Sequence, residues 1–172
     1  MIFATVGTHE DPFDRLIAEL DRLKAAGELS EDVMIQSGYS IFRPTHCTAE
    51  SLMGFPRVQA LMAEARIIIT HGGPASIMKA LAHDKVPIVV PRQSAFGEHV
   101  DDHQVRFARK IANRVVVVLD IKELGPAIRE HATRVSTLAA GSFGAERARA
   151  FALRFDALCG DLLAGRDTVE GA

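Results

Sequence analysis

The sequence predicts an α/β protein, a Rossmann-like parallel sheet with helices on both faces. Three observations support this prediction. Short apolar runs alternate with longer stretches in which apolar residues recur at helical spacing. The run at 115–119 shows no polar alternation, as expected of a strand buried on both faces. The stretch 67–91 reads as strand, glycine turn, helix and strand, which is a βαβ unit with parallel strands.

Length and composition restrict the class of protein. The 172 residues suggest one domain, over 1–165, with a frayed tail at 166–172. The chain is 48% hydrophobic and 24% charged, as expected of a soluble globular protein. A net charge of −2 indicates no broad basic surface for nucleic acid. No membrane span or secretory signal is visible, and Cys47 and Cys159 suggest free thiols in a reducing cytoplasm.

The first third of the chain predicts three strands and two helices. An apolar strand at 1–6 precedes a helix with Asp11 as its N-cap, Pro12 as its first residue and Gly27 at its end. Next we expect a strand at 33–35, a short strand near Ile41 and Phe42, and a helix at 57–65.

The remaining elements follow from apolar spacing. Strands are expected at 67–70, 87–91 and 115–119, and helices from Pro74, at 99–112, at 121–138 and at 145–163. The last helix repeats apolar residues and either packs on the sheet or docks a partner. The predicted inward positions of three helices are Ile77, Met78, Leu81 and Ala82; Val100, Val105, Ala108, Ile111 and Ala112; and Phe151, Phe155, Leu158 and Leu162.

The glycine turn in the middle of the chain predicts an anion site. Gly72 and Gly73 let the backbone approach a ligand closely, and Pro74 suits the first turn of a helix. The free N–H groups at that helix start favour a nucleotide diphosphate. A plain tight turn is the alternative, because two glycines before a helix are not a full dinucleotide fingerprint.

Polar residues follow four of the predicted strands. These strand ends are Gly7-Thr8-His9, Gln36-Ser37-Gly38, His71-Gly72-Gly73 and Arg92 onward. Ligands of an open parallel sheet bind at the carboxyl ends of its strands. We therefore expect these four segments to meet in one binding site.

Five motifs carry a resemblance to a known family. They are TVGTHEDPFDRL at 5–16, QSGYS at 36–40, THGGPASI at 70–77, VPIVVPR at 86–92 and GEHVDDHQ at 97–104. Over residues 1–118 the chain resembles the C-terminal, donor-binding domain of glycosyltransferase family twenty-eight, and most of all its one-domain PssE-type exopolysaccharide subunits. The resemblance implies one half of a GT-B architecture, a UDP-sugar donor, and an inverting hexose transfer that uses neither metal nor cofactor.

The resemblance also implies which residues bind the donor. Segments near the diphosphate are the first strand's loop and the His-Gly-Gly turn, whereas Asp102 and Gln104 correspond to residues that hold sugar hydroxyls. Gln104 offers a donor and an acceptor for a diol, and Ser76 either donates to a phosphate or caps the helix. The predicted substrate-binding residues are Gly7, Thr8, Ser37, Gly38, His71, Gly72, Gly73, Pro74, Ala75, Ser76, Lys79, Arg92, Glu98, His99, Asp102 and Gln104.

Lys79 departs from the family pattern. The family commonly has a glutamate there that binds the ribose diol, and lysine has no acceptor for a diol. Lys79 either approaches a phosphate or faces solvent. Asp84, where glycine is usual, tolerates a left-handed backbone moderately well.

His9 is the candidate catalytic residue, since histidine is the usual proton-transfer group near neutral pH. We favour a phosphate contact over a base, because the family usually draws its base from the other half of the enzyme. His99, Asp102 and His103 could share a helix face as a zinc pair. No third ligand stands out and the His-Glu-x-x-His arrangement is absent, so no metal site is predicted.

The resemblance implies a second polypeptide. The chain has length for one GT-B half, so a membrane-anchored PssD-type subunit is expected to supply the acceptor site for a lipid-linked glycan in polysaccharide biosynthesis. That partner would recruit this cytoplasmic chain to the inner face of the membrane, and the isolated chain could self-associate. A nucleotide-sugar-binding subunit without catalysis is the alternative. A Rossmann oxidoreductase is disfavoured, because no G-x-G-x-x-G follows the first strand.

Overall fold

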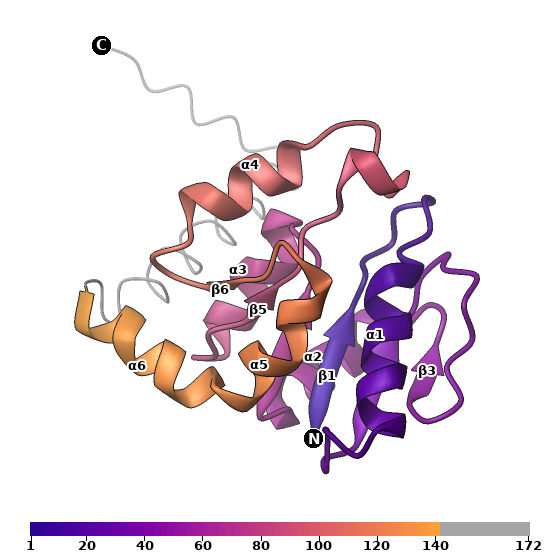
Figure 1. The fold of residues 1–172 in the computed structure, drawn as a ribbon, viewed down its shortest axis with the longest axis horizontal. Coiled ribbons are helices and arrows are strands. Elements are labelled where there is room, and N and C mark those ends of the chain that lie inside the picture. Colours follow the sequence, from indigo (N-terminus) through magenta and orange to yellow (C-terminus); the bar gives the residue numbers. More distant parts are fainter. Residues whose placement is uncertain (142–172) are drawn as a thin grey trace.

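Six parallel strands form one sheet in a computed structural model of the chain, which describes residues 1–141 (Figure 1). Their order is β3-β2-β1-β4-β5-β6, which confirms the predicted Rossmann-like α/β fold. The strands are β1 (Ile2–Thr5), β2 (Val33–Gln36), β3 (Thr48–Glu50), β4 (Ile67–Thr70), β5 (Ile88–Val89) and β6 (Val116–Val117).

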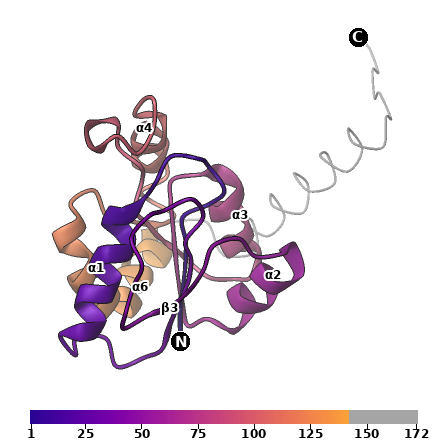
Figure 2. The same cartoon turned by 90° about the vertical axis from the view of Figure 1, so that its right-hand side faces the viewer.

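Helices cover both faces of this sheet. In Figure 2, α1 and α6 lie on one side of the strands, and α2 and α3 lie on the other. The helices are α1 (Asp14–Ala25), α2 (Phe55–Glu64), α3 (Pro74–Ala82), α4 (His103–Lys110), α5 (Leu124–Arg129) and α6 (His131–Gly141), with short 3₁₀ turns η1 (Ser94–Phe96) and η2 (Ile121–Glu123). Within residues 1–141, no helix has both the length and the apolar character needed to cross a bilayer.

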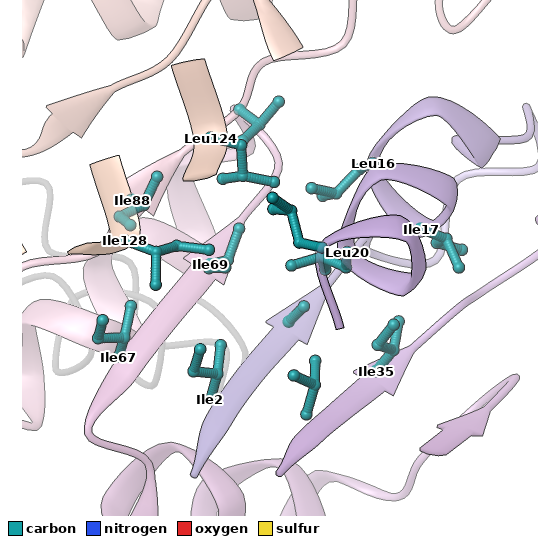
Figure 3. Close-up of a cluster of buried hydrophobic side chains, with 14 of the residues drawn as sticks. Ile2, Leu16, Ile17, Leu20, Ile35, Ile67, Ile69, Ile88, Leu124 and Ile128 are labelled. Carbon is teal, nitrogen blue, oxygen red and sulfur yellow. The ribbon is translucent and has the colours of Figure 1, made fainter. Parts of the chain in front are cut away.

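The larger part of the core lies between the sheet, α1 and α5. Every residue of β1 is buried, and its side chains alternate between the two faces, so Ile2 packs toward α1 while Phe3 packs toward α2. Figure 3 shows this first layer, in which strand isoleucines meet the leucines of α1 and α5. The labelled members are Ile2, Leu16, Ile17, Leu20, Ile35, Ile67, Ile69, Ile88, Leu124 and Ile128.

The opposite face is closed by α2, α3 and α4. Phe3 and Ile68 pack with α2 and with Ala80 of α3, and a second cluster joins Ile77 to Val89 and Ala108. The inward prediction for Ala82 is wrong: this residue is exposed, and Ala80 is buried in its place.

The start of α1 is a correction to the sequence prediction. The helix begins at Asp14, with Phe13 as its N-cap, and not at Asp11 and Pro12. Its end is confirmed, since Gly27 follows the last turn with a φ of +73°. The Asp14 carboxylate accepts hydrogen bonds from the backbone of Ile41 and Phe42. That contact holds 41–42 as a loop, so the strand expected there is also wrong.

Two later helices also differ from their predictions. The helix expected from His99 begins at His103, and Val100 is 85% exposed. Ala112 is exposed as well. The helix expected over 121–138 is divided into η2, α5 and α6. The predicted helix at 145–163 lies outside the described residues.

Asp21 organises the segment before β3. This buried carboxylate of α1 accepts hydrogen bonds from the backbone N–H groups of Thr45, His46 and Cys47. Although burial raises it, these N–H groups lower the pKa of Asp21 to about 2. Cys47, the free cysteine among the described residues, belongs to this segment and is buried.

Candidate functional site

The predicted strand ends do meet at one edge of the sheet. All strands run parallel, so the loops after β1, β2, β4 and β5 leave from the same edge. The chain order reverses between β1 and β4, which are neighbours in the sheet. Ligands of open α/β sheets bind at such a switch point. The Gly7 and His71 turns therefore occupy the position in this fold where a ligand is expected.

The His71 ring lies between two glycine turns. A Cβ added to Gly7, whose φ is +79°, would stand 2.6 Å from Cε1 of His71. A Cβ on Gly73 would collide with Nε2 of the same ring. Both positions therefore require glycine while the imidazole occupies this place.

His71 is a neutral imidazole at physiological pH. Burial, followed by the neighbouring Arg92 charge, lowers the pKa of His71 to about 4. Its Nδ1 is buried and has no hydrogen-bond partner of good geometry, although the backbone of Thr5 lies close enough to offset part of the fall in pKa. A buried nitrogen without a partner costs free energy, so the ring is poised to gain from a ligand that supplies one.

The start of α3 presents free backbone donors. Gly73 is the N-cap, and no side chain caps the helix. Pro74 has no N–H, whereas Ala75 and Ser76 bring their amides to the first turn, where a helix has no internal acceptor for them. Such a helix start suits an anion.

The turn after β2 completes this edge. Gly38 has a φ of +55°, and a Cβ there would stand 2.7 Å from the carbonyl oxygen of Gly7. Ser37 is buried, and its hydroxyl donates to the carbonyl of Glu50. Thr8, by contrast, is exposed on the β1–α1 loop. The structure therefore brings Gly38 beside Gly7 and turns the Ser37 hydroxyl toward β3.

Arg92 has no exposed surface and ties loops together. Its Nη1 donates to the carbonyl of Asp11 at 2.7 Å, to that of Pro12 at 3.3 Å and to that of Glu98 at 3.0 Å. Its Nη2 donates to the carbonyl of Val6 at 3.0 Å. The structure thus gives Arg92 an internal role, and its contact with a substrate stays a prediction.

Glu98 is buried and paired internally. Its carboxylate accepts two hydrogen bonds from the Arg15 guanidinium, at 2.8 and 2.9 Å, and one from the backbone of Gln93. Asp102, another predicted ligand, accepts from the backbone and the hydroxyl of Ser94, and the backbone donor lowers its pKa. Both carboxylates therefore shape the loop between β5 and α4.

Gln104 joins this loop to the glycine turn. Its Oε1 accepts from the backbone N–H of Gly72 at 3.0 Å and of Arg92 at 3.2 Å. Gly72 must lack a side chain here, because a Cβ would stand 2.7 Å from the Cβ of Gln104. The oxygen expected for a sugar diol is thus already engaged, and the contact with sugar stays a prediction. We call Arg15, Arg92, Glu98 and Gln104 the inner network.

Histidines gather outside this network. The ring centroids of His9 and His99 are 4.5 Å apart, and so are those of His99 and His103. Asp101, which the sequence prediction missed, lies 2.6 Å from Nδ1 of His103. Asp102 was expected in that role, but α4 begins after it and the bend turns Asp101 toward the rings. We call His9, His99, Asp101 and His103 the outer histidine cluster.

Lys79 lies one turn into α3 and faces an aromatic ring. Its ammonium is 4.8 Å from the centroid of Phe55, the first residue of α2. The sequence prediction offered phosphate or solvent as the surroundings of Lys79 and missed this ring. Spacing along the chain gave no signal for it, because the two residues belong to different helices.

Comparisons with known proteins identify the family. The sequence model of the glycosyltransferase family 28 C-terminal domain matches residues 1–150. A search of the curated proteins finds no match.

Solved structures share the fold at low sequence identity. The glycosyltransferase SnogD from Streptomyces nogalater is 18% identical with a TM-score of 0.58, covering 91% of this chain and 43% of its own. The glycotransferase of kitacinnamycin is 18% identical with a TM-score of 0.57, covering 89% and 42%. MurG from Acinetobacter baumannii is 17% identical with a TM-score of 0.51, covering 85% and 43%.

This chain thus spans less than half the length of these structures. Its fold is that of one half of a GT-B glycosyltransferase, as the sequence predicted. Because the family model covers most of the chain, the protein belongs to the glycosyltransferase family 28 C-terminal domain family.

Proposed function

We propose that this chain binds a UDP-sugar at the carboxyl ends of β1 and β4 and serves as the catalytic, donor-binding subunit of an inverting hexosyltransferase. The observation that carries the proposal is the junction of two glycine turns with the uncapped start of α3. A departing diphosphate gains negative charge. Oriented N–H groups stabilise such charge without a metal.

The neutral His71 ring fits this role. An imidazole that stays unprotonated at pH 7 offers one donor and one acceptor and adds no net charge. Its orphaned Nδ1 lies at the same junction. A phosphate oxygen or sugar hydroxyl that reached this nitrogen would satisfy it, which favours binding of the donor.

Calorimetry with uridine, UMP, UDP and a panel of UDP-hexoses tests the donor proposal. We expect the affinity to rise as phosphates are added and to fall with salt, because the recognition is of an anion at a helix start. ADP is the control for the base. No heat with any uridine ligand, with or without a partner protein, would refute the proposal.

His9 is proposed to contact phosphate. Its Nδ1 accepts from the Asp11 backbone at 3.2 Å, and the ring remains on the exposed β1–α1 loop. His9→Ala should therefore weaken UDP binding. A variant that keeps its UDP affinity but loses turnover would identify His9 as the base instead.

We also propose that an acceptor-binding, membrane-anchored partner completes the enzyme and presents a lipid-linked glycan. The support is a set of apolar side chains that are exposed at the ligand edge, after β2, β3 and β5. They are Tyr39, Ile41, Phe42, Leu52, Phe55, Phe96 and Val100.

Co-expression with a candidate membrane protein tests this association. Ile41, 73% exposed, is replaced by aspartate, and Ala112→Asp on the opposite edge of the sheet is the matched control. We expect Ile41→Asp to abolish co-purification and transfer, and Ala112→Asp to preserve both. Full transfer activity from the single chain would refute the need for a partner.

Lys79 favours a second candidate, a nucleotide-sugar-binding subunit without catalysis. Its ammonium lies over the ring of Phe55. At this position of the helix the family commonly has the glutamate that binds the ribose diol. If that contact is missing, Lys79→Glu should tighten UDP binding by about 1 kcal/mol. Weaker binding would assign Lys79 to a phosphate. Turnover by the co-purified pair separates an enzyme from a binding subunit.

A further inference from the structure

The outer histidine cluster contains a set of metal-ligand side chains. Ligand atoms of His99, Asp101 and His103 all lie within 4.8 Å of one another. The three residues are every second residue from 99 to 103, along the bend that leads into α4, and His103 is the first residue of that helix. Because the three residues are so close in sequence, the bend alone brings their ligand atoms together.

We propose that His99, Asp101 and His103 form a binding site for a divalent transition-metal ion of the zinc class. Imidazole nitrogen and carboxylate oxygen are the ligands that zinc takes alongside thiolate. Two ligands about 2.1 Å from a tetrahedral ion stand roughly 3.4 Å apart. Closing the present spacing requires shifts of about 1 Å, which partly exposed side chains on a bend can make.

The histidines present their ring nitrogens on a partly exposed bend. Nδ1 of His99 accepts from the backbone N–H of Val100 at 2.9 Å, so the neutral ring carries its proton on Nε2. Because this contact is exposed, water can replace it, and an ion can then bind Nδ1, or Nε2 after the proton moves to Nδ1. Asp101 contacts Nδ1 of His103, and its other oxygen lies 3.2 Å from Arg106. These side-chain contacts are exposed and worth little, so the carboxylate can exchange them for an ion.

His9 connects this site to the β1–α1 loop. Its ring packs against His99 at an interplanar angle of 39° and comes from the loop that also carries Gly7. An ion on His99 would fix the ring against which His9 packs. The site needs no sugar nucleotide, so its existence does not depend on the proposed function.

Titration of the full chain, purified without a polyhistidine tag, with ZnCl2 in a calorimeter tests the proposal. We expect saturable binding of a single ion per chain. His99→Ala and His103→Ala should each weaken it by more than about 100-fold, beyond the loss typical of groups that only support a ligand. Asp101→Asn should weaken it by at least about 10-fold.

His46→Ala is the matched control. His46 is exposed and lies 3.4 Å from the Asp21 carboxylate, so it is a histidine–aspartate pair without a second histidine. We expect its removal to leave zinc affinity unchanged. Circular dichroism of every variant verifies that the fold is retained.

Cobalt(II) substitution separates this site from the thiols. Ligand-field bands without a thiolate charge-transfer band are expected, since the proposed ligands are nitrogen and oxygen. The proposal is overturned if zinc does not bind saturably, if the His99→Ala/His103→Ala double variant binds as well as wild type, or if the cobalt spectrum shows thiolate ligation.

Discussion

The inner network and the outer histidine cluster are neighbours with opposite properties. Arg92 is 0% exposed and Glu98 is 3% exposed, and both are bound to other parts of the chain. His103 and Asp101 leave 47% and 48% of their side chains exposed and contact each other locally. Both groups lie at the strand ends where ligands are expected. The comparison teaches that polar residues at a ligand edge divide into those that build it and those that remain free to bind.

Loss of Arg92 should be the strongest test of the inner network. Arg92→Met removes the donor to four backbone carbonyls, so we expect a loss of about 3–5 kcal/mol in the free energy of unfolding. Urea denaturation measures it. Arg57→Met, which removes an exposed pair with Glu50, is the control and should cost less than about 1 kcal/mol. Equal losses in the two variants would contradict the assigned role.

Gln104→Met should have the next largest effect. It leaves the N–H groups of Gly72 and Arg92 without their acceptor, at an expected cost of about 2–3 kcal/mol. Gln59→Met is the control, because Gln59 has a single partner, on the partly exposed ring of His83. If Gln104 instead serves only the sugar, donor affinity would fall while urea stability stays constant.

His71 should make stability depend on pH. Its folded pKa of about 4 lies below the unfolded value near 6.5, so the unfolded chain takes up the proton first as pH falls. Stability is complete above pH 6.5 and declines below it, by about 2 kcal/mol at pH 5. His71→Gln should remove this part of the pH slope in urea titrations. An unchanged slope in His71→Gln would show that the imidazole is not held neutral.

The outer histidine cluster should matter least for folding. His99→Ala removes a ring from a partly exposed bend, so the free energy of unfolding should change by about 0.5 kcal/mol or less without metal. The same urea measurement with zinc should then separate wild type from the variant. A large loss of unfolding free energy without metal would show that His99 supports the fold, as the inner network does.

Apolar patterning predicted most of the fold because strands such as β4 and β5 are short, buried runs of β-branched residues. The strand β3 has no such run and is partly exposed, and it was missed. The run 67–70 and the helix at Pro74 needed no distant partner to be recognised. The start of α1 failed for the opposite reason. Arg92 holds the Asp11 and Pro12 carbonyls, and Ser40 accepts from the Phe13 backbone, so distant residues override the local cap.

The candidate site divides in the same way. The glycine turns were predictable, because glycine before a proline-led helix is a local signal. The burial of Glu98 depends on Arg15, which lies 83 positions away, and nothing in the spacing of either residue shows the pair. Asp101 was missed because a helix was expected from His99. The alternation of His99, Asp101 and His103 was the signal available for the cluster.

The reactivity of the Cys47 thiol can report how often the segment around it opens. Burial raises the pKa of the Cys47 thiol to about 11, so thiolate is scarce at neutral pH and reagents have little access. Modification requires the segment held by Asp21 to lift away from α1. In a Cys159→Ser background, the rate of thiol labelling therefore counts these openings. Comparing the rates with and without a bound nucleotide would reveal whether occupation of the ligand edge slows the opening of this segment.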